Sequence, residues 1–236
     1  MTLPSPPPGW LLGLDTSAAQ GHLNVPAIVA AGVSALWARA TDGLHDVDAV
    51  WRTGSTQRGC QDAGLPLGVY GVLEPYALSQ VTAQAAHFCD ASAGVDLALP
   101  PWLDFELAHN ESGLAALTSA ADWCDAVEQR LGRGVMVYTG PAFIETLERY
   151  AGHAADAVLA RLAARPLVVA HYTGSVDRPP IVPPPWSEWA VWQASGDHAA
   201  TMPGTRVPVD VDYFRGSLDD LLALGAPSSG SAAQAA

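Results

Sequence analysis

Charged residues and cysteine are both scarce in this sequence of 236 residues. Charged side chains make up 15% of the chain, and its three cysteines, Cys60, Cys89 and Cys124, are widely spaced with no C-x-x-C pair. This pattern excludes a zinc ribbon and does not supply a disulfide framework. We therefore expect all three thiols to be buried and to pack as small apolar side chains.

Basic residues are the rarer of the two charge types. The chain has 11 Lys and Arg against 24 Asp and Glu, which gives a formal net charge of −13. Because such a chain has no basic patch to displace counterions from phosphates, we expect it to bind neither nucleic acid nor an anionic membrane surface. No apolar run approaches the ~20 residues that a membrane-spanning helix needs.

The first ten residues, MTLPSPPPGW, do not have the features of a secretory signal. They carry no positively charged region and no apolar stretch, and their prolines favour an extended lead-in. We expect a protein that is made in the cytoplasm without a signal peptide.

Common catalytic and nucleotide-binding motifs are missing as well. The sequence contains no G-x-S-x-G, no P-loop and no G-x-G-x-x-G. His45, Asp46 and Asp48 resemble a set of metal ligands, but we interpret them as a solvated turn followed by the start of a helix. The sequence therefore predicts no metal site.

Short β-favouring runs alternate with longer Ala-rich stretches along the chain. The predicted strands are residues 10–15, 35–40, 66–73, 99–106, 134–138, 166–172, 189–194 and 207–214. The predicted helices are residues 25–31, 47–63, 78–93, 113–131, 141–147, 154–164 and 217–224. This alternation is typical of an α/β protein with a mostly parallel sheet.

Eight strands with no break in the middle predict a single irregular (β/α) barrel of the TIM type. A proline-rich stretch at 177–185 stands where a helix would precede the seventh strand, so we expect the last strands to lack full helical crossovers. The predicted boundaries are an extended lead-in over 1–9, a catalytic barrel over 10–225 and a flexible tail over 226–236.

Acidic residues lie at the ends of several predicted strands, inside otherwise apolar segments. They are Asp15 in GLDTS, Asp104 and Glu106 in PWLDFE, and Asp210 and Asp212 in VDVDYF. Taken singly, Asp15 or Asp212 fits a helix cap or a loop acceptor better than a catalyst. Taken together, acids at the strand ends of a barrel indicate an active site, because the βα loops open there.

Alternation along the fourth predicted strand separates two faces. Trp102, Asp104 and Glu106 share one face, which we expect to point into the barrel mouth. Leu103, Phe105 and Leu107 share the other face, which we expect to pack under helices. The ~6.6 Å between the Cα atoms of Asp104 and Glu106 lets their carboxyl groups converge on one ligand and raise each other's pKa. Such a pair is typical of a glycosidase.

Aromatic residues near the strand ends suit a carbohydrate groove, because sugar rings stack on aromatic faces. Trp37, Trp51 and Trp123 fit core packing. Tyr138, Tyr172 and Trp192 fit either packing or ligand contact, and His171 fits either the site or a structural hydrogen bond. The candidate substrate-contacting residues are Tyr70, Tyr138, Tyr172, Trp192 and Gln193.

From about Gly13 to Gly216 the sequence resembles the family 25 glycoside hydrolases, the Chalaropsis-type lysozymes or N-acetylmuramidases. The segments that carry the resemblance, in the family's order, are GLDTSAAQG, AAGVSALWARATDG with a downstream Asp46 or Asp48, AGLPLGVYGVLEP, LPPWLDFE, GVMVYTG, AHYT, WAVWQASG and VDVDYF. The chain departs from the family at Tyr70, Gly71 and Val72, where Y-H-F or similar is usual, and at Asp42, where Glu is common. We expect both departures to lie near the groove.

The resemblance implies hydrolysis of the β-1,4 bond between N-acetylmuramic acid and N-acetylglucosamine in peptidoglycan, without a metal or organic cofactor. It implies that Glu106 is the catalytic acid, that Asp104 is its partner, and that Asp15 and Asp210 are further acids of the pocket. We expect a retaining mechanism. The attacking group is either the substrate's own 2-acetamido oxygen, oriented by Asp104, or a carboxylate among Asp104, Asp15 and Asp210.

Two other functions fit the same residues. One is glycan binding without catalysis, by a barrel in a virion or an envelope assembly. The other is hydrolysis of another amino-sugar polymer such as chitin. The absence of a signal and of a wall-binding repeat fits a phage-type endolysin released at lysis, or a part of a virion or an injection machine.

Overall fold

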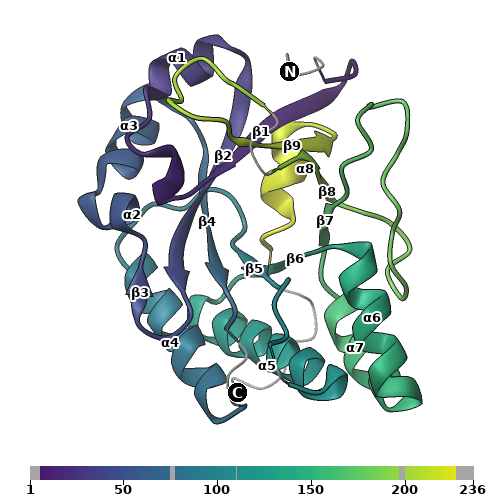
Figure 1. The fold of residues 1–236 in the computed structure, drawn as a ribbon. Helices are drawn as coiled ribbons and strands as arrows, with labels where there is room; N and C mark the ends of the chain where they lie inside the picture. The colour runs from purple at the N-terminus through teal and green to yellow at the C-terminus, as the bar shows by residue number, and fades with distance from the viewer. Residues whose placement is uncertain (1–5, 75–77, 110, 197–199, 227–236) are drawn as a thin grey trace.

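Among the described residues, eight strands close into one barrel in the computed structural model of the chain (Figure 1). Around the barrel they are β1 (Trp10–Thr16), β2 (Val33–Asp42), β4 (Leu67–Val72), β5 (Trp102–Asp104), β6 (Met136–Thr139), β7 (Leu167–Ala170), β8 (Val191–Ser195) and β9 (Asp210–Arg215). Pairing of β1 with β2 closes the ring. The predicted α/β barrel is confirmed.

The structure describes residues 6–74, 78–109, 111–196 and 200–226. Residues 1–5 of the predicted lead-in and 227–236 of the predicted tail lie outside the described residues, so the predicted domain boundaries stay predictions.

The last strand runs against its neighbours. Neighbouring strands from β1 round to β8 are parallel, whereas β9 is antiparallel to both β8 and β1. The first residue of β9, Asp210, therefore lies opposite Asp15, at the end of the barrel where the other strands finish. The prediction that acids occupy the carboxyl ends of strands is thus wrong for Asp210, which reaches the mouth from a strand's beginning.

Helices lie around the outside of the barrel (Figure 1). They are α1 (Val25–Ala30), α2 (Ala49–Thr53), α3 (Ser55–Ala63), α4 (Val81–Ser92), α5 (Gly113–Leu131), α6 (Pro141–Ala151), α7 (Asp156–Ala163) and α8 (Leu218–Ala223), with short 3-10 turns at Ala18–Gln20, Leu78–Gln80 and Gly152–Ala155. Leu221 of α8 packs against the apolar side chains inside the barrel. This helix therefore closes the end opposite the mouth.

Three local differences from the prediction concern the backbone, and two of them have simple causes. The helix predicted over 47–63 is divided into α2 and α3 at Gly54, whose left-handed φ of 70° ends the first helix. The strand predicted over 99–106 shortens to β5, which starts later because Pro100 and Pro101 have no N–H for the ladder. A two-residue strand, β3 (Asp46–Val47), pairs with the end of β2 and was not predicted.

The connection from β7 to β8 contains no helix over residues 171–190, all of which the structure describes. The proline-rich loop is fixed to the barrel where the backbone N–H of Ile181 donates to Nδ1 of His171, over 3.0 Å. This observation confirms the expectation of a missing helical crossover, and it gives His171 a structural hydrogen bond.

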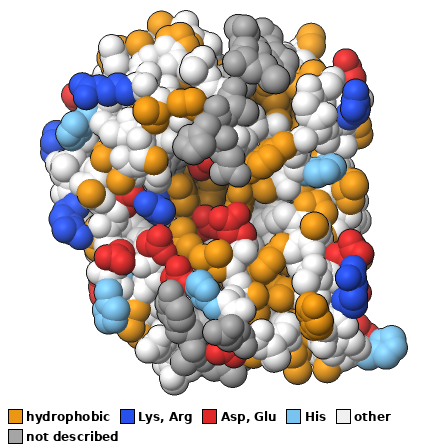
Figure 2. Space-filling model, in the orientation of Figure 1, with side chains coloured by type: hydrophobic (Ala, Val, Ile, Leu, Met, Phe, Trp, Pro, Cys, Tyr) orange, Lys and Arg blue, Asp and Glu red, His pale blue; other side chains and the backbone are white. Residues whose placement is uncertain are grey.

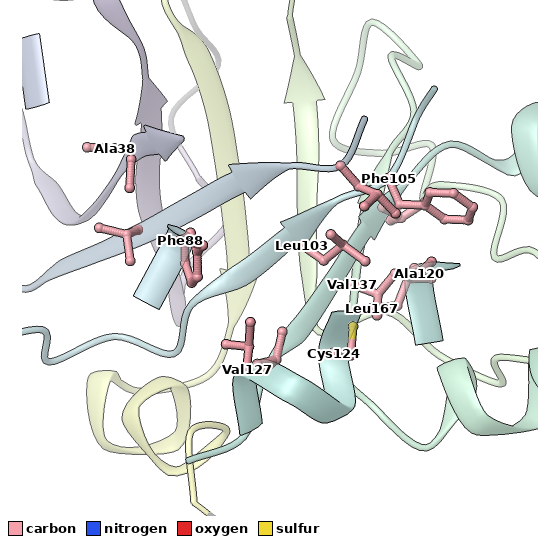
Figure 3. Packing of buried hydrophobic residues seen from close by; sticks show 14 of the residues in the cluster. Ala38, Phe88, Leu103, Phe105, Ala120, Cys124, Val127, Val137 and Leu167 are labelled. Atoms are coloured by element: carbon pink, nitrogen blue, oxygen red, sulfur yellow. The ribbon is translucent and has the colours of Figure 1, made fainter. Parts of the chain in front are cut away.

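The larger apolar core lies between the strands and the helices (Figure 3). Leu103 and Phe105 from the β5 segment lie in it, as the alternation predicted, and so do Phe88 of α4 and Trp123 of α5. The three cysteines are buried and unpaired, which confirms the prediction for them. The helices therefore cover the outward face of β5 and leave its other face to the barrel interior.

A smaller core fills the inside of the barrel. Trp37 and Trp102 stack with their ring centroids 4.7 Å apart, and Tyr70 and Tyr138 also stack with Trp102. Gly68 makes room for this stack, because a Cβ there would lie 2.4 Å from Cδ1 of Trp37. The prediction that Trp37 packs in the core is confirmed, as it is for the buried Trp51 and Trp123.

In the described ranges, no helix is both long and apolar enough to cross a membrane.

Candidate active site

The barrel brings together the four acids that the sequence predicted. Asp15 lies near the end of β1, Asp104 ends β5, Glu106 follows two residues later, and Asp210 begins β9. Figure 2 shows acidic side chains gathered in a hollow on this face, with hydrophobic side chains around them. A pocket of about 150 Å³ at the mouth is lined by Asp15, Asp210 and Tyr70, among others.

The acids differ in depth. Asp15 is 5% exposed, Asp104 and Asp210 are partly exposed, and Glu106 is exposed. β5 ends at Asp104, and the alternation still holds at Phe105 but no longer at Leu107. Leu107 instead packs against the apolar cluster inside the barrel, and the prediction that it packs under the helices is wrong.

Burial and mutual repulsion hold protons in the cluster. Burial raises the pKa of Asp15 to about 8, and the negative charge of Asp210 acts in the same direction. Burial also raises the pKa of Asp104 well above its usual range, and the charges of Glu106 and Asp15 raise it further. Crowded carboxyl groups of this kind can exchange protons near neutral pH, as general acid catalysis requires.

Gln193 of β8 holds Asp15 in place. Its Nε2 donates to Oδ2 of Asp15 over 2.8 Å, while its Oε1 accepts hydrogen bonds from the hydroxyls of Tyr138, over 3.0 Å, and Tyr172, over 2.7 Å. These bonds fix which way the amide faces. Gln193 is 2% exposed, so the structure corrects the prediction that it contacts substrate and places it beneath the surface as a support.

The three predicted tyrosines lie around the mouth at different depths. Tyr70 and Tyr138 are buried, and Tyr70 lines the pocket. Tyr172 is 49% exposed and lies over Gly196, where a Cβ would come within 2.2 Å of the tyrosine hydroxyl. Tyr172 therefore has the largest ring surface of the three for contact with a ligand.

Trp192 does not face the mouth. It is fully buried in the outer core, edge-on to Trp10 and close to Trp189 and Tyr213, and its Nε1 donates to the backbone oxygen of His171 over 2.8 Å. Residues 192 and 193 point to opposite sides of β8, and Gln193 has the inward side. The prediction that Trp192 contacts substrate is wrong.

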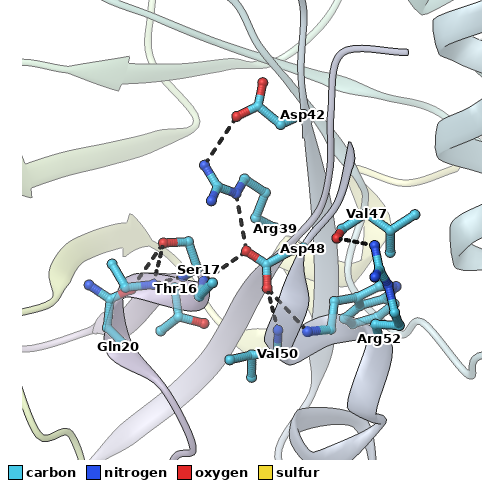
Figure 4. Close-up of polar contacts among 12 residues, drawn as sticks. Thr16, Ser17, Gln20, Arg39, Asp42, Val47, Asp48, Val50 and Arg52 are labelled. Atoms are coloured by element: carbon cyan, nitrogen blue, oxygen red, sulfur yellow. Dashed lines mark hydrogen bonds and ion pairs between the residues drawn. The ribbon is translucent and has the colours of Figure 1, made fainter. Parts of the chain in front are cut away.

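Arg39 is a residue of the mouth that the sequence reasoning missed. It is paired in register with Tyr70 and forms ion pairs with Asp48, over 3.2 Å, and Asp42, over 3.4 Å (Figure 4). Its positive charge lowers the pKa of Asp104, against the larger effect of burial. Arg39 lies two residues after Trp37, and this period-two spacing could have revealed it.

Asp48 is a structural residue. Its side chain accepts hydrogen bonds from the backbone N–H groups of Val50 and Trp51 at the start of α2 and from Ala18 in the loop after β1. This geometry confirms that a helix begins here. Within the described residues, no group of three or more His, Cys, Asp or Glu side chains could hold a metal ion.

The two departures from the family pattern lie in different places. Asp42 is at the rim, within reach of Arg39, and burial raises its pKa against the opposing charge of that arginine. Gly71 faces away from the mouth, because a Cβ there would lie 2.7 Å from Cδ2 of Phe88 on α4. The expectation that this departure lies near the groove is wrong for Gly71, whereas Val72 lies in the apolar cluster inside the barrel, in register with Asp104.

Comparisons with known proteins agree with one another. The sequence model of Glycosyl hydrolases family 25 matches residues 14–201. Lysozyme M1 of Streptomyces globisporus is 31% identical over 224 residues, which cover 90% of this chain and 70% of that protein. The bacterial lysozyme of Streptomyces coelicolor superposes with a TM-score of 0.75 at 28% identity, covering 91% of this chain and 96% of the other. A muramidase from Trichobolus zukalii gives a TM-score of 0.69 at 28% identity, covering 92% and 100%.

Proposed function

Because this chain belongs to glycosyl hydrolase family 25, we propose that it is a retaining N-acetylmuramidase with Glu106 as general acid and base and Asp104 as its partner. Membership of the family makes it a glycoside hydrolase of the lysozyme type, which hydrolyses peptidoglycan. The bond cleaved, the stereochemistry and the roles of individual residues are our proposals.

Glu106 is well placed to meet a long polymer. It is exposed at the mouth, whereas the other acids are partly or fully buried. A proton donor to a glycosidic oxygen must reach a bond in a chain that runs across the surface. In the first step Glu106 protonates the departing oxygen, and in the second it takes a proton from the water that attacks the anomeric carbon.

A single oxygen atom of Asp104 carries the proposal. Oδ1 of Asp104 is buried, and in the described part of the chain no donor reaches it. An acceptor left without a donor is costly, so a ligand that brings an N–H group is favoured there. The 2-acetamido group of an amino sugar has such an N–H group. This match favours polymers of N-acetylated amino sugars over glycans that lack an acetamido group.

The same atom supports one of the two routes of attack. If Asp104 accepts the amide N–H, the carbonyl oxygen of that 2-acetamido group is held for attack on the anomeric carbon, and the sugar itself forms the intermediate. The alternative is attack by a carboxylate of Asp104, Asp15 or Asp210. Both routes proceed through two inversions and give net retention.

Replacement of the general acid tests the central role. Glu106→Gln should lower the rate of clearing of a peptidoglycan suspension by about 10²–10⁴-fold, because an amide cannot donate and retrieve the proton. Glu145→Gln is the matched control, because Glu145 is an exposed glutamate on α6 that pairs with Arg149, away from the mouth. Equal activity of Glu106→Gln and the control would remove Glu106 from the mechanism.

Product analysis tests the finer assignments. Mass spectrometry of a wall digest should find new reducing ends on N-acetylmuramic acid, and NMR spectra recorded early should show the β-anomer first. New reducing ends on N-acetylglucosamine would refute the proposed bond, and an α-anomer would refute retention. Chitin treated in parallel tests the other polymer. Delivery from a lysing cell, a virion or an injection machine stays a prediction.

A further inference from the structure

Asp212 is the deepest carboxyl group of the acidic cluster. It lies two residues after Asp210 on β9, on the same inward side, and is 1% exposed. Its neighbours across the sheet are Gly13 of β1 and Gln193 of β8. A Cβ at Gly13 would lie 3.2 Å from the Cβ of Asp212, so this side chain packs tightly against the backbone of β1.

The hydrogen bonding of Asp212 is unusual for a buried acid. Among the residues that the structure describes, no N–H or O–H group donates to either of its carboxyl oxygens. The group within hydrogen-bonding reach is the carboxyl group of Asp15. Two carboxylates cannot form a hydrogen bond with each other, so this contact is favourable only when one of the two carries a proton.

The surroundings decide which of the two carries it. Asp15 accepts from Nε2 of Gln193, and a donor of this kind stabilises the ionised form of a carboxyl group. Asp212 has no equivalent donor among the described residues and is buried more deeply. Burial raises the pKa of Asp212 well above its usual range, and the charges of Asp15 and Asp210 act in the same direction.

We propose that Asp212 is a permanently protonated carboxyl group that donates a hydrogen bond to Asp15 and so acts as a positioning residue of the active site. Gln193 and Asp212 then hold Asp15 from two sides, each with one donor. These two bonds lower the pKa of Asp15 and oppose the burial and the charge of Asp210 that raise it to about 8. The effect on catalysis rests on the proposed function, whereas the protonation of Asp212 does not.

Several other titratable or charged groups face this pair, and their charges enter any pH profile. They are Asp210 on β9, Glu106 and Asp104 at the end of β5, Tyr70 on β4, Tyr138 on β6 and Arg39 on β2. A test of Asp212 must therefore observe its own proton as well as the activity of the enzyme.

The direct test is carbon-13 NMR of the wild-type protein labelled at its aspartate carboxyl carbons. Between about pH 5 and pH 7 an ordinary aspartate is ionised. The signal that disappears in Asp212→Asn should keep the chemical shift of a protonated acid over this whole range. A carboxylate shift at any point in the range would overturn the proposal. This result does not depend on whether the protein hydrolyses peptidoglycan.

Two variants test the hydrogen bond through the pKa of Asp15, read from the same spectra and from the pH profile of wall clearing. Asp212→Asn keeps a donor and should leave the pKa of Asp15 within about half a unit of wild type. Asp212→Leu removes the donor and should raise it by about one to two units. If Asp212 were ionised, both variants would remove a negative charge and lower the pKa of Asp15, which would refute the proposal.

The two proposals can fail separately. If the wild-type protein does not clear peptidoglycan but its Asp212 is protonated, only the muramidase function is refuted. If the wild-type protein clears peptidoglycan but its Asp212 is ionised, only the positioning role is refuted. If Asp212→Leu does not fold, the wild-type spectrum and the Asp212→Asn variant still decide the question.

Discussion

The two halves of the barrel interior are filled by different kinds of side chain. One half, here called the aromatic half, comprises Trp37, Tyr70, Trp102 and Tyr138 on β2, β4, β5 and β6. The other, the acidic half, comprises Asp15, Gln193, Asp210 and Asp212 on β1, β8 and β9. Both sets occupy inward-facing positions. The aromatic half gains dispersion and apolar burial, whereas the acidic half retains charged and polar groups that destabilise the fold.

This difference separates the residues that stabilise the fold from the residues that carry the chemistry. Stacked rings that exclude water contribute to folding. Buried carboxyl groups that repel one another do not, and their persistence in an otherwise apolar interior indicates a function. Asp104 lies at the mouth end of β5, the strand in the middle of the aromatic half that also carries Trp102.

The largest expected effect comes from breaking the aromatic half. Trp102→Ala removes the central ring of the stack and should lower the free energy of unfolding by about 3–5 kcal/mol. Urea denaturation followed by circular dichroism measures it. Asp210→Asn in the acidic half is the matched comparison, and it should preserve or raise the free energy of unfolding while lowering activity. Equal destabilisation by both changes would contradict the division into halves.

The pH dependence of stability reports on the acidic half. In the folded state the pKa of Asp15 is raised to about 8, whereas in the unfolded state it is about 3.9. Between these values the folded protein binds the additional proton, so the free energy of unfolding should fall as the pH rises. The slope from this one group is at most about 1.4 kcal/mol per pH unit. Urea denaturation at a series of pH values between about 5 and 8 measures it.

Asp15→Asn is the control for this slope, because it removes one titrating group and should make the fall shallower. Asp104 and Asp212, whose pKa values burial also raises, keep a slope of the same sign. Acids whose pKa is lowered, such as the exposed Asp125, which is bonded to Arg161 and Arg165, act below this range and do not oppose the effect. Stability that rises with pH over the same interval would show that the carboxyl cluster is ionised in the folded protein.

Two glycine substitutions compare the inside of the barrel with its outer face. In Gly68→Ala the new methyl group would meet the ring of Trp37, and in Gly71→Ala it would meet the ring of Phe88 beneath α4. Each should cost about 1–3 kcal/mol of stability through overpacking. Only Gly68→Ala disturbs the aromatic stack, so only it should also reduce activity. Thermal unfolding and wall clearing, measured together, check this, and lost activity in folded Gly71→Ala would contradict it.

The smallest expected effect concerns the hydroxyl groups that donate to Gln193 of the acidic half. Tyr172→Phe removes one of the two hydroxyl donors to Gln193, and the bond from Tyr138 remains. We expect a loss of about 0.5–1.5 kcal/mol in stability and a modest fall in activity. Urea denaturation and wall clearing measure the two effects. A loss as large as that of Glu106→Gln would show that Tyr172 has a direct part in the reaction.

Much of the fold and part of the site follow from local patterns. Alternation between apolar runs and Ala-rich stretches predicted the strands of the barrel, because strand and helix formation depends on neighbouring residues. Period-two spacing placed Leu103 and Phe105 under the helices and Asp104 toward the interior. The same reasoning failed at Leu107, where the strand had already ended.

Other features depend on how the barrel closes. Both sides of β8 are buried, so nothing in the local sequence shows that Gln193 faces inward and Trp192 outward. The direction of β9 is decided by its pairing with β8 and β1, and this pairing sets Asp210 at the mouth and Asp212 beneath it.

The sequence by itself determined the order of the elements, the apolar and acidic composition of each strand, and the spacing of Asp104 and Glu106. Tertiary structure alone decided how deep each carboxyl group lies and which one receives a donor. The reason is physical. Secondary-structure preferences act over a few residues, whereas the protonation of a buried acid depends on solvent exclusion and on charges that only the closed barrel brings together.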